Sequence, residues 1–215
     1  MPAGGTYRNT WWSLQEVRRK TDALTEKQRL RKQILDCRDA LGAAPRASFS
    51  RDSTARIVAL PTYQGARCVM AYSSVGSEFN TTAFMADAKA KGKTLVLPRA
   101  PRGGLMLELY VVGDLEHDLA PGVWGIREPR PEVCRRVSPH DIDFVLVPGV
   151  AFTAHCDRLG YGKGFYDRLI VQFSRRPCLV AAAFAVQIVP ELPLSGTDQP
   201  VDLVITEETA YSRET

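Results

Sequence analysis

The sequence predicts a three-layer α/β/α protein with a mainly parallel, Rossmann-like sheet. Short apolar runs typical of buried strands alternate along the chain with segments of helical periodicity. A glycine-rich loop follows one of these runs and precedes a helical pattern, as expected where a strand leads into a helix. The hydrophobic fraction of 45% in 215 residues is ordinary for a globular domain.

The predicted elements follow in order along the chain. A capping-box pattern at Thr25 and Gln28 predicts that a helix begins there, with an apolar face made by Leu30, Ile34 and Leu41. A second helix is predicted over residues 48–60, and a third from Asn80 or Thr81 to residue 91. Buried strands are predicted at residues 67–72, 94–97, 105–112, 143–148, 178–184 and 203–205. Residues 120–131, rich in proline and glycine, predict a loop.

A parallel sheet also predicts where a site would lie. Ligands bind beyond the carboxyl ends of the strands in such folds. The loops after Tyr72, Leu97 and Pro148 are therefore expected to converge on one crevice.

The chain length suits one domain with a small appendage. We expect residues 25–215 to form the domain and residues 1–24 to form an N-terminal extension. Within the extension, Trp11, Trp12, Leu14 and Val17 predict one short amphipathic helix that ends in Arg18-Arg19-Lys20. We expect a cytoplasmic location. Organellar import is the alternative, because a basic amphipathic start is also typical of organellar presequences. No apolar run approaches 18 residues, which predicts no membrane span.

Charge and cysteine content narrow the function classes. Residues 1–67 carry 13 Lys/Arg and 6 Asp/Glu, a net +7, whereas the remainder carries 15 and 18, a net −3. The basic positions lack the interleaved aromatic residues of a nucleic-acid surface, so a small anionic molecule is the expected partner, with no nucleic acid and no membrane. Five cysteines without a C-x-x-C pair predict a reducing compartment. We expect a monomer.

The most informative segment is the glycine-rich loop from Arg158 to Arg168. Its glycines would let backbone amides surround a phosphate, and Lys163 would add a full positive charge. Three glycines alternate with other residues, at Gly160, Gly162 and Gly164. This is not a Walker A loop, because Asp157 holds the first glycine position, and the spacing also differs from G-x-G-x-x-G. The alternative is a glycine-rich turn with a solvated lysine.

With the preceding segment Val147-Pro148-Gly149-Val150-Ala151-Phe152, this loop closely resembles that of the 5-formyltetrahydrofolate cyclo-ligase family, also called methenyltetrahydrofolate synthetases. Weaker similarities occur in the family's order over about residues 25–206. They are Lys27-Gln28-Arg29-Leu30-Arg31 with Leu35 and Arg38, Tyr72-Ser73-Ser74 with Glu78-Phe79-Asn80-Thr81, Gly92 to Arg99, Trp124 to Pro129, and Val201-Asp202.

The resemblance implies a ligase of one-carbon folate metabolism that uses ATP and Mg²⁺. The formyl oxygen of 5-formyltetrahydrofolate would attack the γ-phosphate of ATP, and a neighbouring folate nitrogen would then close the ring. The products would be 5,10-methenyltetrahydrofolate, ADP and phosphate. Activation by ATP is sensible because phosphate is a far better leaving group than a hydroxide-like oxygen.

The resemblance also implies roles for individual residues. The implied ATP-binding positions are Lys27, Arg31, Arg158, Leu159, Gly160, Tyr161, Gly162, Lys163, Gly164, Phe165 and Tyr166. The implied catalytic residues are Lys163, Arg158 and Tyr166. The implied folate-binding residues are Glu78, Trp124, Tyr161 and Phe165, and the implied magnesium ligands are Asp167 and Asp202.

Residue type alone leaves other interpretations open. Lys27 and Arg31 also fit a solvated basic helix face, Glu78 a solvated turn and Trp124 a buried loop anchor. For the whole chain, one alternative is a sugar-phosphate isomerase or acyl transferase of related architecture, which would need a carboxylate base near the loop but no ATP. Another is a non-catalytic nucleotide- or RNA-binding module.

Overall fold

A seven-stranded sheet forms the centre of the computed structural model, which describes residues 10–101, 103–122 and 125–213, with side chains from residue 22 onward. The strand order is β11-β10-β9-β6-β1-β2-β3. The bounds are β1 (Cys68–Met70), β2 (Thr94–Arg99), β3 (Glu108–Val111), β6 (Phe144–Leu146), β9 (Cys178–Ala182), β10 (Leu203–Ile205) and β11 (Ala210–Ser212). The strands from β10 to β2 are parallel, and β3 and β11 add antiparallel edges. The predicted mainly parallel sheet is confirmed.

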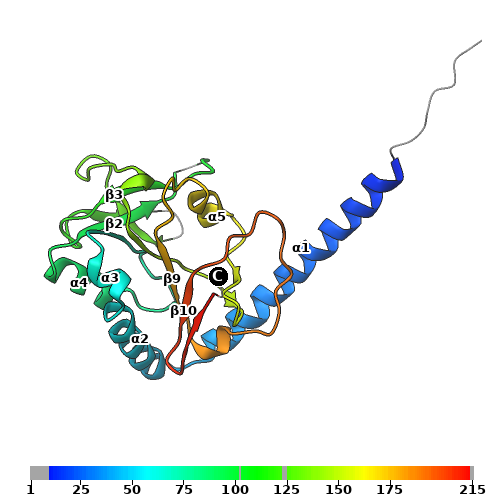
Figure 1. Ribbon diagram of the computed structural model, residues 1–215, viewed down its shortest axis with the longest axis horizontal. Helices are drawn as coiled ribbons and strands as arrows, with labels where there is room; N and C mark the ends of the chain where they lie inside the picture. The colour runs from blue at the N-terminus through cyan, green and yellow to red at the C-terminus, as the bar shows by residue number, and fades with distance from the viewer. Residues whose placement is uncertain (1–9, 102, 123–124, 214–215) are drawn as a thin grey trace, which may run out of the picture.

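Helices cover both faces of the sheet and complete the predicted three layers (Figure 1). One face carries α2 (Ala43–Val58), α3 (Pro61–Gly65) and α4 (Thr82–Ala90), and the other carries α5 (Phe165–Ile170). Alternate residues of β1 enter the two cores: Val69 packs with Phe84 on the α4 side, and Met70 packs with Leu169 on the α5 side. The short 3₁₀ helices η2 (Pro139–Asp141) and η3 (Ala185–Gln187) lie in connections.

Helix α1 (Thr10–Asp39) is longer than predicted, so the predicted start at Thr25 is wrong. The helix runs without a break through residues 24 and 25, so the capping-box pattern at Thr25 and Gln28 lies in a helix interior. Its C-terminal part lies against the body, where Leu30 and Ile34 cover the hairpin of β7 (Ala151–Phe152) and β8 (Arg158–Leu159). Toward its N-terminus the helix extends away from the body (Figure 1). Among the described residues, no helix combines the length and apolar run that crossing a bilayer requires.

The loop predicted over residues 120–131 is wrong in part. It contains β5 (Arg127–Pro129) and most of β4 (Leu119–Pro121), which pair as a separate antiparallel ribbon. Proline is tolerated there because an edge strand leaves some backbone positions without a ladder bond. Other predicted boundaries also shift: the strand at 105–112 is confined to 108–111, the helix at 48–60 lies at 43–58, and the strand at 210–212 was not predicted.

Gly149, just beyond β6, supports the turn that leads to the site. A Cβ atom there would lie 2.4 Å from the ring of the buried Phe152. We expect Gly149→Ala to lower the free energy of unfolding by about 1–3 kcal/mol through overpacking. The control is Gly65→Ala, whose added Cβ meets no described atom within 4 Å. Denaturant unfolding would measure both variants, and equal stability would contradict this account of the turn.

Candidate active site

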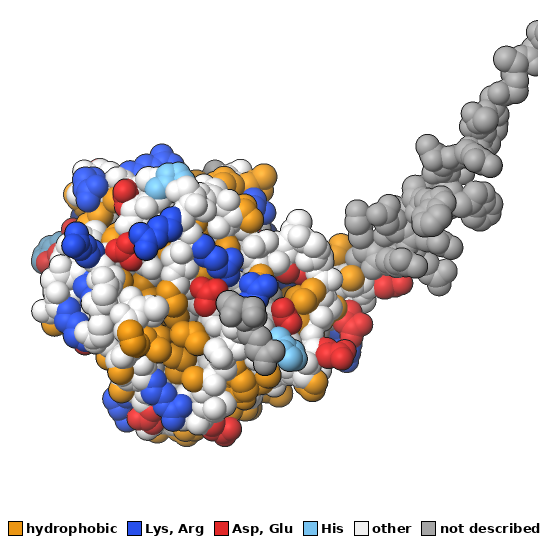
Figure 2. Space-filling model, viewed as in Figure 1, with side chains coloured by type: hydrophobic (Ala, Val, Ile, Leu, Met, Phe, Trp, Pro, Cys, Tyr) orange, Lys and Arg blue, Asp and Glu red, His pale blue; other side chains and the backbone are white. Residues whose placement is uncertain are grey.

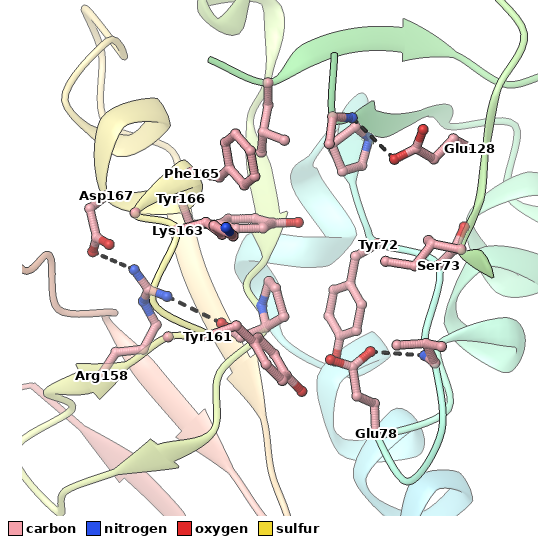
Figure 3. Close-up of a pocket in the computed structure, with 18 residues that line it drawn as sticks. Tyr72, Ser73, Glu78, Glu128, Arg158, Tyr161, Lys163, Phe165, Tyr166 and Asp167 are labelled. Carbon is pink, nitrogen blue, oxygen red and sulfur yellow. Dashed lines mark hydrogen bonds and ion pairs between the residues drawn. The ribbon is translucent and has the colours of Figure 1, made fainter. Parts of the chain in front are cut away.

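A pocket of about 380 Å³ opens beyond the carboxyl ends of β1, β2 and β6 (Figure 3). It is the crevice that the sequence predicts, since its lining includes the residues that follow all three strands. The lining residues are Tyr72, Ser73, Val75, Glu78, Pro98, Ala100, Leu107, Ile126, Glu128, Pro148, Arg158, Gly160, Tyr161, Lys163, Gly164, Phe165, Tyr166 and Asp167.

The glycine-rich loop forms one wall of this pocket, between β8 and α5. Gly162 and Gly164 have φ angles of 98° and 65°, in the left-handed region that side chains other than glycine rarely adopt. These angles turn the chain back, so that Lys163 lines the pocket while its backbone oxygen accepts a hydrogen bond from Arg168 at 2.6 Å. Helix α5 has six residues and follows Gly164 directly.

Arg158 anchors the base of the loop. Its side chain is 2% exposed and its Nη2 lies 2.5 Å from Oδ1 of Asp167, while Nη1 donates to the Pro148 carbonyl at 3.3 Å. The Asp167 carboxylate also accepts a hydrogen bond from the backbone amide of Gln199 at 3.1 Å. The Nε of Arg158 is buried without a partner among the described residues. The pair therefore joins β8, α5 and the segment before β10.

Two cations of α1, Lys27 and Arg31, point toward the body instead of lying on a solvated face. The Lys27 ammonium lies 2.5 Å from Asp198 and 3.2 Å from the Ser195 hydroxyl, and Lys27 is buried. Arg31 donates from Nε to the Gly160 carbonyl at 2.8 Å, which ties α1 to the loop. On the face shown in Figure 2, Lys and Arg side chains are scattered over the body.

These contacts also perturb two of the groups. Burial lowers the pKa of Arg31, and the Asp198 charge partly offsets this effect. Burial alone would raise the pKa of Asp198, but hydrogen bonds from Lys27 and Ser195 outweigh it and hold that pKa below its usual value. Asp198 therefore stays ionised as the partner of Lys27.

Glu78 faces the loop from the turn that follows β1. Its Oε2 accepts a hydrogen bond from the Val75 amide at 2.9 Å (Figure 3). Burial raises its pKa above the usual value for glutamate, while Tyr161, the Val75 amide and the charge of Arg38 limit the rise. Burial and the Glu78 charge in turn raise the pKa of Tyr161 and of Tyr166. On this side of the pocket, the Glu78 carboxylate thus lies among protonated tyrosines.

Comparison with known proteins identifies this arrangement. The profile of the 5-formyltetrahydrofolate cyclo-ligase family matches residues 23–207. The chain belongs to this family. It is 30% identical over 194 residues to the 5-formyltetrahydrofolate cyclo-ligase of Mus musculus, which covers 86% of this chain and 92% of that protein. It is also 30% identical over 162 residues to a probable 5-formyltetrahydrofolate cyclo-ligase of Caenorhabditis elegans, covering 71% of this chain and 78% of that protein.

Solved structures support the same assignment. The NMR structure of the 5,10-methenyltetrahydrofolate synthetase of Aquifex aeolicus superposes with a TM-score of 0.77 at 33% sequence identity, covering 88% of this chain and 93% of that one. The synthetase structure from Mycoplasma pneumoniae gives a TM-score of 0.68 at 25% identity, over 85% and 99% of the two chains. The resemblance deduced from the loop and the weaker motifs is confirmed.

The cyclo-ligase fold brings most of the predicted loop residues to one place. Lys163, Phe165 and Tyr166 line the pocket, and the Tyr166 hydroxyl is buried without a partner among the described residues. Leu159 differs, because its side chain lies in the core beneath α1, which leaves only its backbone to meet a nucleotide. Lys27 pairs with Asp198, and Arg31 donates to the Gly160 carbonyl of the loop. Neither side chain lines the pocket. Their ATP contacts stay predictions.

Three of the four predicted folate residues, Glu78, Tyr161 and Phe165, line the pocket. Tyr161 is 44% exposed and its hydroxyl lies beside Glu78 (Figure 3). The ring of Phe165 lies 5.6 Å from the Arg168 guanidinium carbon. Trp124 lies outside the described residues, but Ile126 of the same segment lines the pocket.

The two predicted magnesium ligands have different surroundings, and only Asp167 lines the pocket. Asp202 precedes β10, at the amino-terminal end of the strand, where Oδ1 accepts from Arg176 and Oδ2 from the Leu179 amide. In the described part of the chain, no three His, Cys, Asp or Glu side chains come together as a metal-binding group. Mg²⁺ commonly takes one or two protein carboxylates and completes its shell with phosphate and water. A single carboxylate, that of Asp167, is therefore compatible with an ion carried by the nucleotide.

Sequence reasoning gave no role to several residues of this site. Tyr72, Ser73 and Glu128 line the pocket, and Glu128 is buried with its Oε1 accepting from the Ala100 amide at 3.2 Å. The position of Tyr72 and Ser73 directly after a predicted strand was the available signal. Asp198 carried no such signal, because its partner Lys27 is 171 residues away in the sequence.

Replacing Glu78 with glutamine tests the folate side of the pocket. Glutamine keeps the size but loses the charge that favours a bidentate contact with an aminopyrimidine edge, so we expect half-saturation for 5-formyltetrahydrofolate to rise about tenfold and that for ATP to change little. Because burial raises the Glu78 pKa, wild-type half-saturation for folate should rise as pH falls toward that pKa, and the variant should lose this dependence. Steady-state kinetics against pH would measure both effects, with exposed Glu116→Gln as the control. Equal losses for ATP and folate would contradict a substrate-specific role.

Proposed function

We propose that this protein closes the ring of 5-formyltetrahydrofolate in an ATP-dependent reaction, as a 5-formyltetrahydrofolate cyclo-ligase. One observation carries the proposal: Lys163 of the glycine-rich loop and Glu78 of the β1–α4 turn line the same pocket in a chain that belongs to this family. The loop offers positive charge for phosphates, and the turn offers a carboxylate for the hydrogen-bond donors of a pterin.

The reaction needs two bonds to form in sequence. The formyl oxygen attacks the γ-phosphorus of ATP, the bond to ADP breaks, and the formyl carbon becomes an electrophilic imidate. The neighbouring folate nitrogen then attacks this carbon and loses its proton, and the carbon–oxygen bond breaks to release phosphate. Such chemistry depends on positioning and charge neutralisation more than on a protein nucleophile.

The residues of the loop wall suit these demands. Lys163 places an ammonium in the pocket, where it would stabilise charge on the transferred phosphoryl group. The Tyr166 hydroxyl is a buried donor without a partner among the described residues, and a phosphate or formyl oxygen would satisfy it. Arg158 is held by Asp167 and Pro148, so its role is to brace the loop and to add positive charge beneath it.

The Mg²⁺ that accompanies ATP would be held by Asp167, together with phosphate oxygens and water. When bound, it would neutralise phosphate charge. Asp167→Asn leaves a poorer ligand for a hard cation, so the variant should need more Mg²⁺ to reach half its maximal rate. Magnesium titration at saturating substrates measures this, with Asp202→Asn titrated in parallel. An unchanged titration for Asp167→Asn would show that Asp167 does not bind the ion, and Asp202 would be the first other ligand to test.

One assay tests the proposed activity against its alternatives. The full chain is mixed with 5-formyltetrahydrofolate, Mg²⁺ and ATP, and the absorbance band of the methenyl product is followed. We expect the band to grow only with ATP, with one phosphate released per product. A sugar-phosphate isomerase, an acyl transferase and a non-catalytic nucleotide-binding module would all leave the band absent, and that result would refute the proposal.

The assembly and location of the enzyme belong to the same proposal. We propose a monomer, which light scattering of the purified chain would check. We also propose a cytoplasmic location, with organellar import as the alternative that a tagged full-length chain would reveal.

We also propose residues 1–24 as an extension of the cyclo-ligase domain at 25–215. Limited proteolysis near residue 24 with retained activity would support this division, even though α1 spans it.

A further inference from the structure

Arg38 of α1 links the two sides of the pocket. It is 4% exposed, donates from Nε to the Ser77 hydroxyl at 2.9 Å, and donates from Nη1 to the Tyr161 hydroxyl at 2.9 Å. Ser77 immediately precedes Glu78, and Tyr161 lies in the glycine-rich loop. One buried side chain therefore holds the folate-side turn and the phosphate-side loop at the same time.

The seat of this arginine is itself constrained. The Ser77 hydroxyl donates to the carboxylate of Asp39, the residue after Arg38, so two adjacent residues of α1 bracket one hydroxyl. The Arg38 guanidinium carbon also lies 6.0 Å from the centre of the Tyr161 ring. A lysine could not reproduce this arrangement, because it lacks the rigid fork that reaches two oxygens at once.

The hydrogen-bond chemistry of Tyr161 follows from this contact. Its oxygen accepts from Arg38, so its own proton must point elsewhere, and the acceptor beside it is the Glu78 carboxylate. The charged or titratable groups facing Glu78 are Arg38 from α1, Tyr72 from the end of β1, and Tyr161 and Tyr166 from the loop and α5. Arg38 supplies the positive charge in this set.

We propose that Arg38 is a positioning residue that orients the Tyr161 hydroxyl toward Glu78 and so holds both sides of the pocket in register for ATP and folate. This inference rests on the proposed function for its two ligands. Arg38 touches neither reacting group. It acts by fixing Ser77, and with it the backbone of Glu78, relative to the loop that presents Lys163.

The kinetic test uses three variants and one control. Arg38→Met keeps an apolar stem, and we expect half-saturation for both ATP and 5-formyltetrahydrofolate to rise about tenfold, the scale of a lost charged hydrogen bond. Tyr161→Phe should raise both values, and the double variant should be no worse than Arg38→Met, because the two residues act through one contact. The control is Arg46→Met, a half-buried arginine of α2 outside the pocket. Additive losses in the double variant, or a fall in turnover with both half-saturation values unchanged, would overturn the proposal.

A second measurement does not depend on activity. Carbon-13 NMR of labelled glutamate, with Glu78→Gln for assignment, follows the Glu78 titration in the full chain. We expect its pKa to rise in Tyr161→Phe and in Arg38→Met, and to stay unchanged in Arg46→Met. Tyr161 is partly exposed in a loop, so its variant tests the contact even if Arg38→Met does not fold. An unmoved pKa in Tyr161→Phe refutes the positioning role, whereas absence of a methenyl band in the wild type refutes only the proposed reaction.

Discussion

Replacing Lys163 with alanine is expected to slow turnover by roughly 10²–10³-fold while the fold stays intact, the scale of one lost electrostatic contact to a transition state. The side chain is exposed and lines the pocket, and the hydrogen bond that Arg168 donates to residue 163 goes to the backbone, which alanine keeps. The loss should therefore fall on chemistry and not on stability.

The measurement is turnover at saturating ATP and folate, together with thermal unfolding. Lys32→Ala is the matched control, because Lys32 is an exposed lysine of α1 outside the pocket. Near-normal turnover for Lys163→Ala would show that Lys163 does not bind phosphate and is a solvated lysine in a glycine-rich turn.

Replacing Arg158 with methionine is expected to lower the free energy of unfolding by about 3–5 kcal/mol, since it leaves Asp167 in a mostly buried site without its cation. At about 2–4 °C per kcal/mol for a chain of this size, the Tm should fall by roughly 10 °C. Calorimetry or denaturant unfolding would measure the loss.

Two further variants separate this pair from a general arginine effect. Arg158→Met/Asp167→Asn removes the unpaired charge and should recover part of the lost stability. Arg130→Met breaks the exposed pair with Glu132 and should cost less than about 1 kcal/mol. Similar small losses for both single arginine variants would show that the Arg158–Asp167 pair does not hold the loop.

The residues around the loop have two kinds of role: some face the pocket, and others hold the loop in place. Lys163 and the Tyr166 hydroxyl face the pocket, whereas Arg158, Arg31 and Arg38 hold the loop from beneath and from α1. A loop with two positive-φ glycines has no side chains of its own to keep it in place at those positions, so it depends on contacts from neighbouring elements.

The loop and the sheet were predictable from the sequence because their signals are local. Apolar runs and helical periodicity reflect burial of adjacent residues, and alternating glycines with Lys163 reflect the backbone shape and charge that a phosphate requires. The convergence of the loops after Tyr72, Leu97 and Pro148 followed from a general property of parallel sheets. The same signals, with the weaker motifs in order, carried the family resemblance.

Contacts between distant segments were decided only by the tertiary structure. Helical spacing placed Lys27 and Arg31 on one face of a helix but could not say whether that face met water or Asp198 and Gly160. The Thr25 capping pattern could not predict that α1 begins fifteen residues earlier, because a helix start depends on what precedes it. The link from Arg38 to Tyr161 spans 123 residues, and the pair of Arg158 with Asp167 depends on how the loop folds back. Such hydrogen bonds and ion pairs need specific distances and angles, and these arise only when the packed elements fix the side chains in space.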